Sequence, residues 1–348
     1  MKPLFKPFMP ELPELDIIIH SGKLAFGEYN LLFESELKNY FQTPYVITTN
    51  TFSSAIDVVI AALDLKPGDE IIASPMACLV STQPYAAHFI KIVWADIDPK
   101  RGTLDPEDVS AKISSKTRAI VHNHFCGYPG YIDEINEIGK KKGIPVIDDC
   151  IEAFGSKYKG RIVGNCGTDI SIFSLSAVRN PNTIDGGIIV FNSESLFKKA
   201  SLIRDNGIDR TLFRDELGEI NPLCDISLIG CSAMPSNING YIGLEQMKHI
   251  SRLLFNSKKN ADNWMKIING GEAPIVSDDI EPNYWVFGFL TCNKKETIKK
   301  YRSLGYCAST VHINNNIYSV FGNKIELKGV SDFYNSFVAL PTGWWLDE

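Results

Sequence analysis

The sequence predicts an α/β protein whose sheet is mostly parallel and is covered by helices. Short apolar runs rich in β-branched residues recur between about residues 45 and 192, and helical patterns separate several of them. Strands that alternate with helices in this way pair in parallel and are buried on both faces. Ligands of such sheets lie at the carboxyl ends of the strands, so we expect functional residues there.

The predicted elements follow one another at short intervals. Strands are expected at residues 45–49, 70–74, 89–95, 119–123, 145–149, 170–173 and 187–191. Helices are expected at residues 53–65, 195–205, 238–254 and 298–304, and a further strand at residues 285–290. A loop rich in Gly, Pro and Asn precedes residue 236. We therefore expect a large α/β domain with an N-terminal segment at residues 1–235, and a small α+β domain at residues 236–348.

Composition points to a cytoplasmic protein that acts on small molecules or protein partners. The chain has 348 residues, a formal charge of -6 and a pI near 5.6, which argues against a nucleic-acid binder. Three prolines interrupt the first ten residues, unlike a signal peptide, and the longest apolar stretch, Tyr284 to Cys292, is too short to span a membrane. The eight cysteines form no Cys-x-x-Cys pair, so no metal site is expected.

One segment carries a specific motif. Phe173, Ser174, Arg179, Asn180 and the Gly186-Gly187 pair precede an apolar strand. This run resembles the signature Phe-Ser-x-x-x-x-Lys-Asn of the DegT family of nucleotide-sugar aminotransferases, which depend on pyridoxal phosphate (PLP). The resemblance extends from about residue 21 to the end of the chain. It implies a PLP-transferase fold of type I, a homodimer and a nucleotide-sugar ligand.

Arg179 occupies the position where the resemblance implies the Schiff-base lysine. A guanidinium stays protonated at physiological pH and cannot form that bond. PLP, or its amine form pyridoxamine phosphate (PMP), would therefore be held without a covalent bond, if it is bound at all.

Asp149 and Glu152 match a second motif of the family, an apolar strand followed by Asp, two residues, Gln or Glu, and Ala-x-Gly. The resemblance implies that Asp149 pairs with the pyridine nitrogen of PLP. The alternative is that Asp149 caps the next helix. The spacing of thirty residues from Asp149 to Arg179 matches that of the family and favours the cofactor site.

Three positions implied for the cofactor depart from the family pattern. Thr51-Phe52-Ser53 stands in place of Ser-Gly-Thr, so Phe52 would crowd the phosphate, although Ser53 and Ser174 could supply hydroxyls. Ser53 as an ordinary helix N-cap is an equal alternative. Cys78 replaces the aromatic residue that stacks on the ring. A nucleophilic role for Cys78 lacks a visible partner base.

The remaining candidates concern the substrate and the second subunit. Met234 replaces the arginine of the family's subunit-crossing Gly-Tyr-Asn-x-Arg loop, while the helix that follows still matches and favours a dimer. His312 and Asn316 lie where relatives place residues that contact the substrate. His124 aligns with a family histidine. Each histidine is equally consistent with a structural role.

Three functional hypotheses follow, and ordinary transamination is doubtful in all of them. The first is an enzyme of amino- or deoxy-sugar and surface-polysaccharide biosynthesis that binds PLP or PMP without a covalent bond. The second is a catalytically silent dimeric homologue that binds a nucleotide-sugar or a partner enzyme. The third is a cofactor-free enzyme that uses the same cleft, with Arg179 as an anion clamp and His124 or His312 as acid-base.

Overall fold

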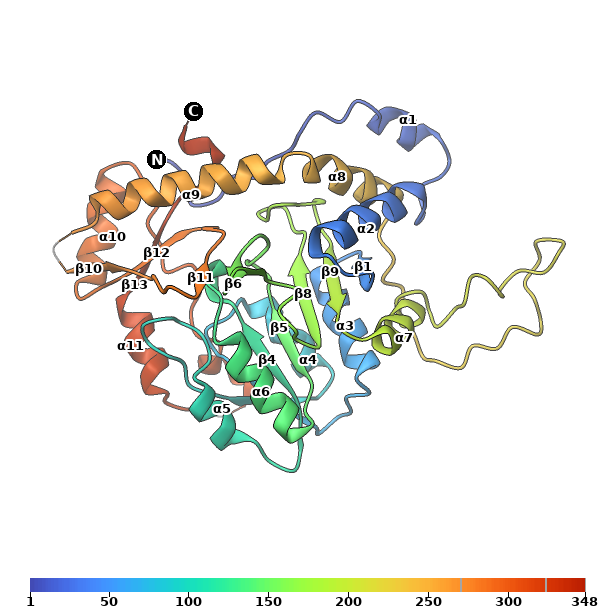
Figure 1. Cartoon of the computed structure of the whole chain (residues 1–348), viewed down its shortest axis with the longest axis horizontal. Coiled ribbons are helices and arrows are strands. Elements are labelled where there is room, and N and C mark those ends of the chain that lie inside the picture. The colour runs from blue at the N-terminus through green and yellow to red at the C-terminus, as the bar shows by residue number, and fades with distance from the viewer. Residues whose placement is uncertain (270, 323, 348) are drawn as a thin grey trace.

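A seven-stranded sheet forms the centre of the molecule (Figure 1). The structure is a computed structural model that describes residues 1–269, 271–322 and 324–347. In spatial order the strands are β1 (Val46–Thr49), β9 (Gly187–Phe191), β8 (Ile170–Ser174), β5 (Val146–Asp149), β4 (Thr117–Asn123), β2 (Glu70–Ala73) and β3 (Lys91–Trp94). Strand β9 is antiparallel to both of its neighbours, and the pairs from β8 to β3 are parallel. The predicted fold class is therefore confirmed.

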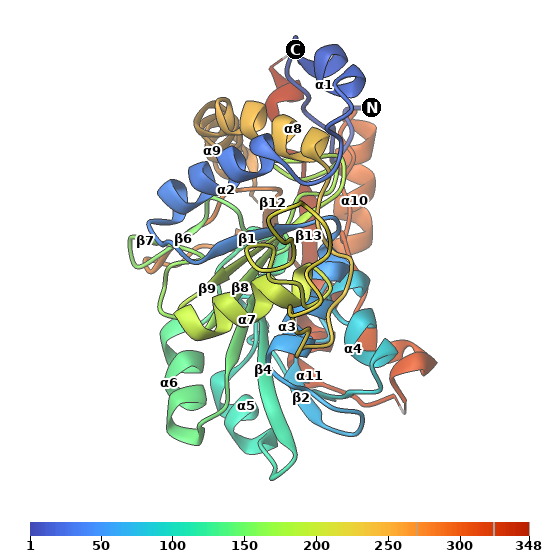
Figure 2. The ribbon, with the colours of Figure 1, turned by 90° about the vertical axis from the view of Figure 1, so that its right-hand side faces the viewer.

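Helices surround this sheet on both faces (Figures 1 and 2). They are α1 (Leu15–His20), α2 (Glu28–Phe41), α3 (Phe52–Ala62), α4 (Gln83–Ala87), α5 (Pro106–Lys112), α6 (Ile132–Lys142), α7 (Glu194–Arg204), α8 (Asn237–Met247), α9 (Ile250–Ile267), α10 (Lys294–Ser303) and α11 (Lys328–Ser336). Short 3₁₀ turns occur at Leu79–Ser81, Phe125–Gly127, Asn315–Ile317, Ser319–Phe321 and Trp344–Leu346.

The two faces of the sheet have different neighbours. Val109 of α5 and Ile135 of α6 pack with Ile120 and Val146 in one apolar cluster, whereas the next residues along the same strands, Val121 and Ile147, belong to the main core on the other face. Because side chains alternate along a strand, the remaining residues of β4 and β5 also divide between the two faces. His122 and Asp148 lie on the α5–α6 side, and Asn123 and Asp149 lie on the main-core side.

The C-terminal part adds two small sheets. One consists of β10 (Glu272–Pro274), β12 (Phe287–Thr291) and β13 (Phe337–Leu340), and the other of β11 (Ile280–Glu281), β6 (Lys157–Tyr158) and β7 (Arg161–Ile162). The second sheet pairs a C-terminal strand with the N-terminal part of the chain. The boundary predicted at residue 235 stays a prediction.

Two expected elements differ in the structure. The helix expected at residues 238–254 is divided into α8 and α9 near Lys248 and His249. Helix α8 packs closely on α2 at Gly240. The absence of a side chain there allows the close approach, since a Cβ atom on Gly240 would come within 2.4 Å of the Asn30 backbone. The strand expected from residue 89 begins at Lys91, since Phe89 adopts a left-handed conformation with φ of 58°.

An extended arm leaves the body of the molecule between α7 and α8 (Figure 1). Two isolated antiparallel bridges join its two sides, one between Asp205 and Ser232 at its base and one between Arg214 and Ile220. Leu217, Leu223 and Ile229 on this arm are 87%, 90% and 95% exposed. Within the described part of the chain, no helix combines the length and the apolar character needed to cross a membrane.

Candidate functional site

The ends of the central strands bring several predicted residues together. Asp149 ends β5, and Arg179 follows β8 by five residues. Glu152 lies in the turn after β5, and His312 reaches it from the C-terminal part with an Nε2–Oε1 distance of 2.7 Å. Arg179 Nη2 lies 3.5 Å from the same Glu152 oxygen. We refer to Arg179, Glu152 and His312 as the strand-end cluster.

Arg179 is held in place by an aromatic ring that no sequence motif indicates. Its guanidinium lies 4.3 Å from the centre of the Trp285 ring. The indole of Trp285 donates to the Val178 carbonyl at 3.0 Å and stacks on Phe5 at 4.2 Å. Trp285 is 106 residues from Arg179 along the chain, so no local motif connects the two. The Arg179 side chain is only 8% exposed.

Glu152 has a hydrogen bond on each of its two carboxylate oxygens. One carboxylate oxygen contacts His312, and the other accepts the Cys126 backbone N–H at 2.7 Å. Burial opposes ionisation of Glu152, but His312, Arg179 and the Cys126 amide hold its pKa below the ordinary value. Glu152 therefore carries a negative charge beside the guanidinium.

The Asp149 carboxylate lies on the main-core side of the central sheet and is held by hydrogen bonds. Its carboxylate accepts the Asn123 side-chain amide at 2.8 Å and the Ile151 N–H at 3.2 Å. Burial raises the pKa of Asp149, although Asn123 and Ile151 oppose this shift. The residues after Asp149 form a turn and not a helix, so the helix-cap interpretation is wrong. Asn123 was missed, but strand alternation could have found it.

Cys78 lies near the strand-end cluster as a neutral thiol. Burial, followed by the charge of Glu152, raises its pKa to about 11, and Arg179 opposes this shift. A thiol with so high a pKa is a poor nucleophile near neutral pH. The Cys78 carbonyl is contacted by Asn315, which ties this loop to the C-terminal part.

Helix α3 begins one position before the site proposed for its cap. Thr51 is the N-cap, and its hydroxyl accepts the Ser54 N–H at 2.9 Å. The interpretation of Ser53 as the N-cap is therefore wrong. Phe52 is buried in the main core at the first helical position. Ser174 contacts the Ser176 hydroxyl at 3.2 Å.

The other predicted residues are divided between the cluster and its surroundings. Asn180 borders the same small space as Arg179. Asn316 is buried and donates to the Ile325 carbonyl at 2.8 Å, which gives it a structural contact. Met234 is half-buried at the base of the arm. Its predicted contact with a second subunit stays a prediction.

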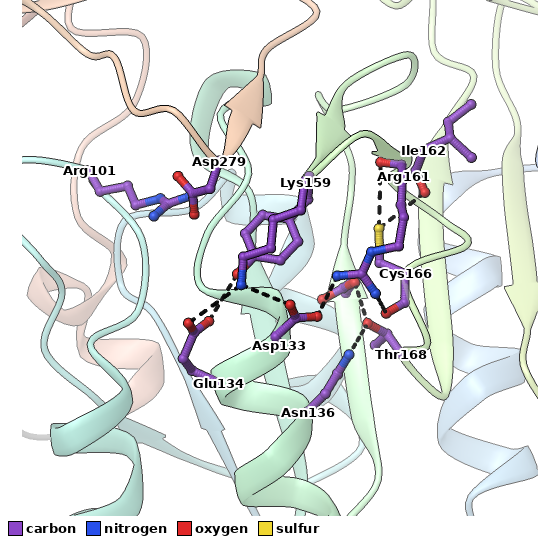
Figure 3. Close-up of polar contacts among 12 residues, drawn as sticks. Arg101, Asp133, Glu134, Asn136, Lys159, Arg161, Ile162, Cys166, Thr168 and Asp279 are labelled. Atoms are coloured by element: carbon purple, nitrogen blue, oxygen red, sulfur yellow. Dashed lines mark hydrogen bonds and ion pairs between the residues drawn. The ribbon is translucent and has the colours of Figure 1, made fainter.

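His124 does not join the strand-end cluster. Its ring is fully buried, and its Nε2 lies 3.5 Å from Asp148, whose other oxygen accepts the Thr168 hydroxyl at 2.7 Å. Thr168 in turn accepts from the Asn136 amide (Figure 3). Asp148 belongs to the opposite face of the sheet from Asp149. The structure therefore gives His124 no access to the cleft where the sequence analysis expects it.

His122, His124 and Asp148 lie close enough together to suggest a metal site, with their ligand atoms within 4.8 Å of one another. The hydrogen bond from the Gly130 N–H to His124 Nδ1, at 3.1 Å, argues against it. An imidazole that accepts at Nδ1 carries its proton on Nε2, the atom that faces Asp148. Burial would raise the pKa of Asp148, but the two histidines hold it well below the ordinary value. The three residues form a buried cluster in which Asp148 carries the charge.

These residues fit a covalently held PLP poorly. Asp149 is suitable for a pyridinium, because its carboxylate is buried and lies at a strand end. However, Arg179 offers no amine for a Schiff base, and Cys78 offers no ring for stacking. The space between Arg179, Glu152, Asn180 and Trp285 measures about 20 Å³, enough for about one water molecule. The side chain at position 179 therefore does not fit a covalently bound PLP.

Comparisons with known proteins agree with the fold. The model of the DegT/DnrJ/EryC1/StrS aminotransferase family matches residues 10–329. The chain is 29% identical over 273 residues to the GDP-perosamine synthase of Escherichia coli O157:H7, a match that covers 78% of this chain and 71% of that protein.

Two solved structures superpose over nearly the whole chain. The sugar aminotransferase CalS13 from Micromonospora echinospora has a TM-score of 0.91 at 26% identity, covering 99% of this chain and 95% of that one. The PMP form of Spr1654 from Streptococcus pneumoniae has a TM-score of 0.89 at 20% identity, covering 99% and 94%, and shows the shared fold. Because the family model covers most of the sequence, the chain belongs to the DegT/DnrJ/EryC1/StrS aminotransferase family.

Proposed function

We propose that this protein is a cytoplasmic homologue of the sugar aminotransferases, with a role in amino-sugar and surface-polysaccharide metabolism, that binds a nucleotide-sugar without ordinary transamination. One observation carries the proposal. The side chain at position 179, where the family resemblance implies the Schiff-base lysine, is a buried guanidinium stacked on Trp285. A guanidinium is neither a nucleophile for an aldehyde nor an effective general base near neutral pH.

The expected ligand class follows from the relatives. The GDP-perosamine synthase to which the chain is similar is named for a nucleotide-linked sugar. Asp149, Glu152 and His312 remain as hydrogen-bonded polar groups at the ends of β5 and β8 even though residue 179 is altered. A silent homologue that keeps the fold would use these polar groups for binding and not for covalent chemistry.

The experiment has two readouts. Purified protein mixed with PLP and reduced with borohydride should yield no pyridoxyl-lysine peptide from the cleft, and calorimetric titration with GDP-linked sugars should show saturable binding. A stoichiometric adduct on one cleft lysine would contradict the loss of the covalent bond. Absence of binding by every nucleotide-sugar tested would contradict the ligand class.

The arm supports a homodimer as part of this proposal. Leu217, Leu223 and Ile229 expose large apolar side chains in a segment that projects from the molecule (Figure 1). Exposed apolar surface of this kind is typical of a contact with another chain. The family resemblance assigns a subunit-crossing role to residues 230–234, at the base of the arm, so a second copy is the expected partner.

Light scattering tests the dimer. The wild-type chain should have twice the monomer mass at micromolar concentration, and the double change Leu223→Asp and Ile229→Asp should shift it toward the monomer. Leu304→Asp, at an exposed leucine outside the arm, should leave the dimer intact. A stable wild-type monomer would overturn this part of the proposal.

A second candidate function is cofactor-free acid-base chemistry in the same cleft. The contact between His312 and Glu152, at 2.7 Å, favours it, because a carboxylate can orient an imidazole and stabilise its protonated form. Product formation from a bound nucleotide-sugar without added PLP, lost in His312→Gln, would support this candidate over the silent homologue.

A further inference from the structure

The Arg179 guanidinium is buried but makes no side-chain hydrogen bond with any part of the chain that the structure describes. Its Nε and Nη1 atoms are inaccessible to solvent and have no partner. Its Nη2 atom lies 3.5 Å from Glu152, which is longer than an effective N–H to oxygen hydrogen bond. Buried polar groups are nearly always paired, so this exception needs a physical explanation.

Glu152 does not supply the missing hydrogen bonds, because its nearest oxygen lies 3.5 Å from Arg179 Nη2. Its Oε1 is engaged by His312 at 2.7 Å and its Oε2 by the Cys126 amide at 2.7 Å. The carboxylate therefore compensates the charge of Arg179 at a distance, while its two short hydrogen bonds go to His312 and the Cys126 amide. The guanidinium keeps its donor capacity for another group.

The surroundings hold this guanidinium in one place. Trp285 covers it at 4.3 Å and is itself fixed by Val178 and Phe5. Arg179 lines a space of about 20 Å³ together with other polar residues, namely Ser174, Asn180, Ser257 and Asn283. A space of this size holds about one water molecule, so it admits no more than a single polar group of a ligand and excludes a whole sugar or pyridine ring. Such a fixed cation beside a small polar space is preorganised for binding.

We propose that Arg179 binds the carboxylate group of a small-molecule ligand, such as an acidic sugar or an amino acid, at the end of β8. A planar carboxylate matches the planar guanidinium and would accept the hydrogen bonds that the protein leaves unmade. The proposal rests on the proposed function in that the ligand occupies the same cleft. It assigns to Arg179 a binding role that the lysine of an aldimine-forming enzyme would not have.

The test uses sodium acetate as the probe and the midpoint of thermal unfolding as the readout. About 100 mM acetate, compared with chloride at equal ionic strength, should raise the midpoint of the wild-type protein by about 2 °C through binding to the folded state. The same concentration of phosphate should give a smaller rise. Arg179→Gln should remove the acetate-specific rise, and Arg161→Gln, at a half-exposed arginine elsewhere, should retain it.

Several results would overturn the proposal. These are no acetate-specific rise in the wild type, an undiminished rise in Arg179→Gln, an equal loss in Arg161→Gln, or a larger rise with phosphate than with acetate. If Arg179→Gln does not fold, Arg179→Lys replaces it and should show less than half of the wild-type rise, because the planar pair is lost. An undiminished rise in Arg179→Lys would then contradict the inference.

The acetate result can be separated from the proposed function. Loss of nucleotide-sugar binding with the acetate effect retained would refute the ligand class proposed for the cleft and leave the carboxylate site in place. Nucleotide-sugar binding without any acetate effect would refute the carboxylate site and leave the ligand class proposed for the cleft in place.

Discussion

Two buried arginines of this protein have similar surroundings but different bonding. Arg101 and Arg179 are 6% and 7% exposed, and each lies over an aromatic ring, Tyr131 at 4.4 Å and Trp285 at 4.3 Å. Arg101 also donates to the Pro129 carbonyl and to Asp279, both at 2.9 Å. Figure 3 shows Arg101 beside Asp279. The guanidinium of Arg179 makes no hydrogen bond to the described residues.

This difference separates a structural arginine from one that is available for a ligand. The hydrogen bonds of Arg101 join the segment before α5 to the C-terminal part of the chain, so its charge stabilises the fold. Arg179 incurs the cost of burial without those bonds. Burial and aromatic stacking alone do not distinguish the two roles, whereas the hydrogen-bond partners do.

The largest expected effect concerns the lysine itself. Arg179→Lys should not restore transamination, because the ring-stacking residue, the open phosphate position and the subunit-crossing arginine would still be missing. Three lost contacts at about 1–3 kcal/mol each would weaken cofactor binding by several powers of ten. The measurements are aldimine absorbance with PLP and the half-reaction with glutamate.

The matched variant for this prediction combines Arg179→Lys with Cys78→Phe and Met234→Arg. It should bind PLP more tightly than the single variant. Full activity in Arg179→Lys alone would show that only the lysine had been lost and would favour an active enzyme.

The second prediction concerns the bonded arginine. Arg101→Gln should lower the free energy of unfolding by about 3 kcal/mol, because the Pro129 carbonyl and Asp279 would lose their buried cationic donor. Urea unfolding gives this value. Arg118→Gln, at a half-exposed arginine, should change it by less than about 0.5 kcal/mol. A loss below about 1 kcal/mol in Arg101→Gln would remove the basis of the comparison.

A smaller effect is expected in the pH dependence of stability. The pKa of Glu152 is lower in the folded state than its ordinary value of 4.5. At acidic pH the unfolded chain therefore binds more protons at Glu152 than the folded chain, and stability falls as the pH drops below 4.5. In Glu152→Gln the free energy of unfolding should depend less steeply on pH in that range. Glu281→Gln, at an exposed carboxylate, is the control. Equal slopes in both variants would contradict the assignment of Glu152.

The sequence predicted the fold and part of the candidate site, for identifiable reasons. Apolar runs and turn residues located each strand of the central sheet, and the parallel order placed Asp149 and Arg179 at neighbouring strand ends. The position of Thr51 as the cap of α3 was missed, because an N-cap is defined by backbone geometry that differs by only a residue or two from the alternatives.

Other features depend on contacts that no local pattern contains. Trp285 and Phe5 reach Arg179 from distant parts of the chain, so their stacking could be found only in the folded structure. His124 was expected in the cleft, but its ring contacts the Asp148 side of the sheet. Successive side chains of β4 and β5 point to opposite faces of the sheet. This alternation could have indicated that His122 and Asp148 lie on the other face from Asn123 and Asp149.

We infer that Arg179 is buried for a ligand and not for the fold. The most direct measurement is the free energy of unfolding of Arg179→Gln by urea denaturation without ligand, beside Arg101→Gln. We expect Arg179→Gln to stay within about 1 kcal/mol of the wild type, because Glu152 keeps its bonds to His312 and Cys126 and a buried charge is removed. A loss of about 3 kcal/mol, equal to that of Arg101→Gln, would show that Arg179 is a structural arginine and would contradict the account.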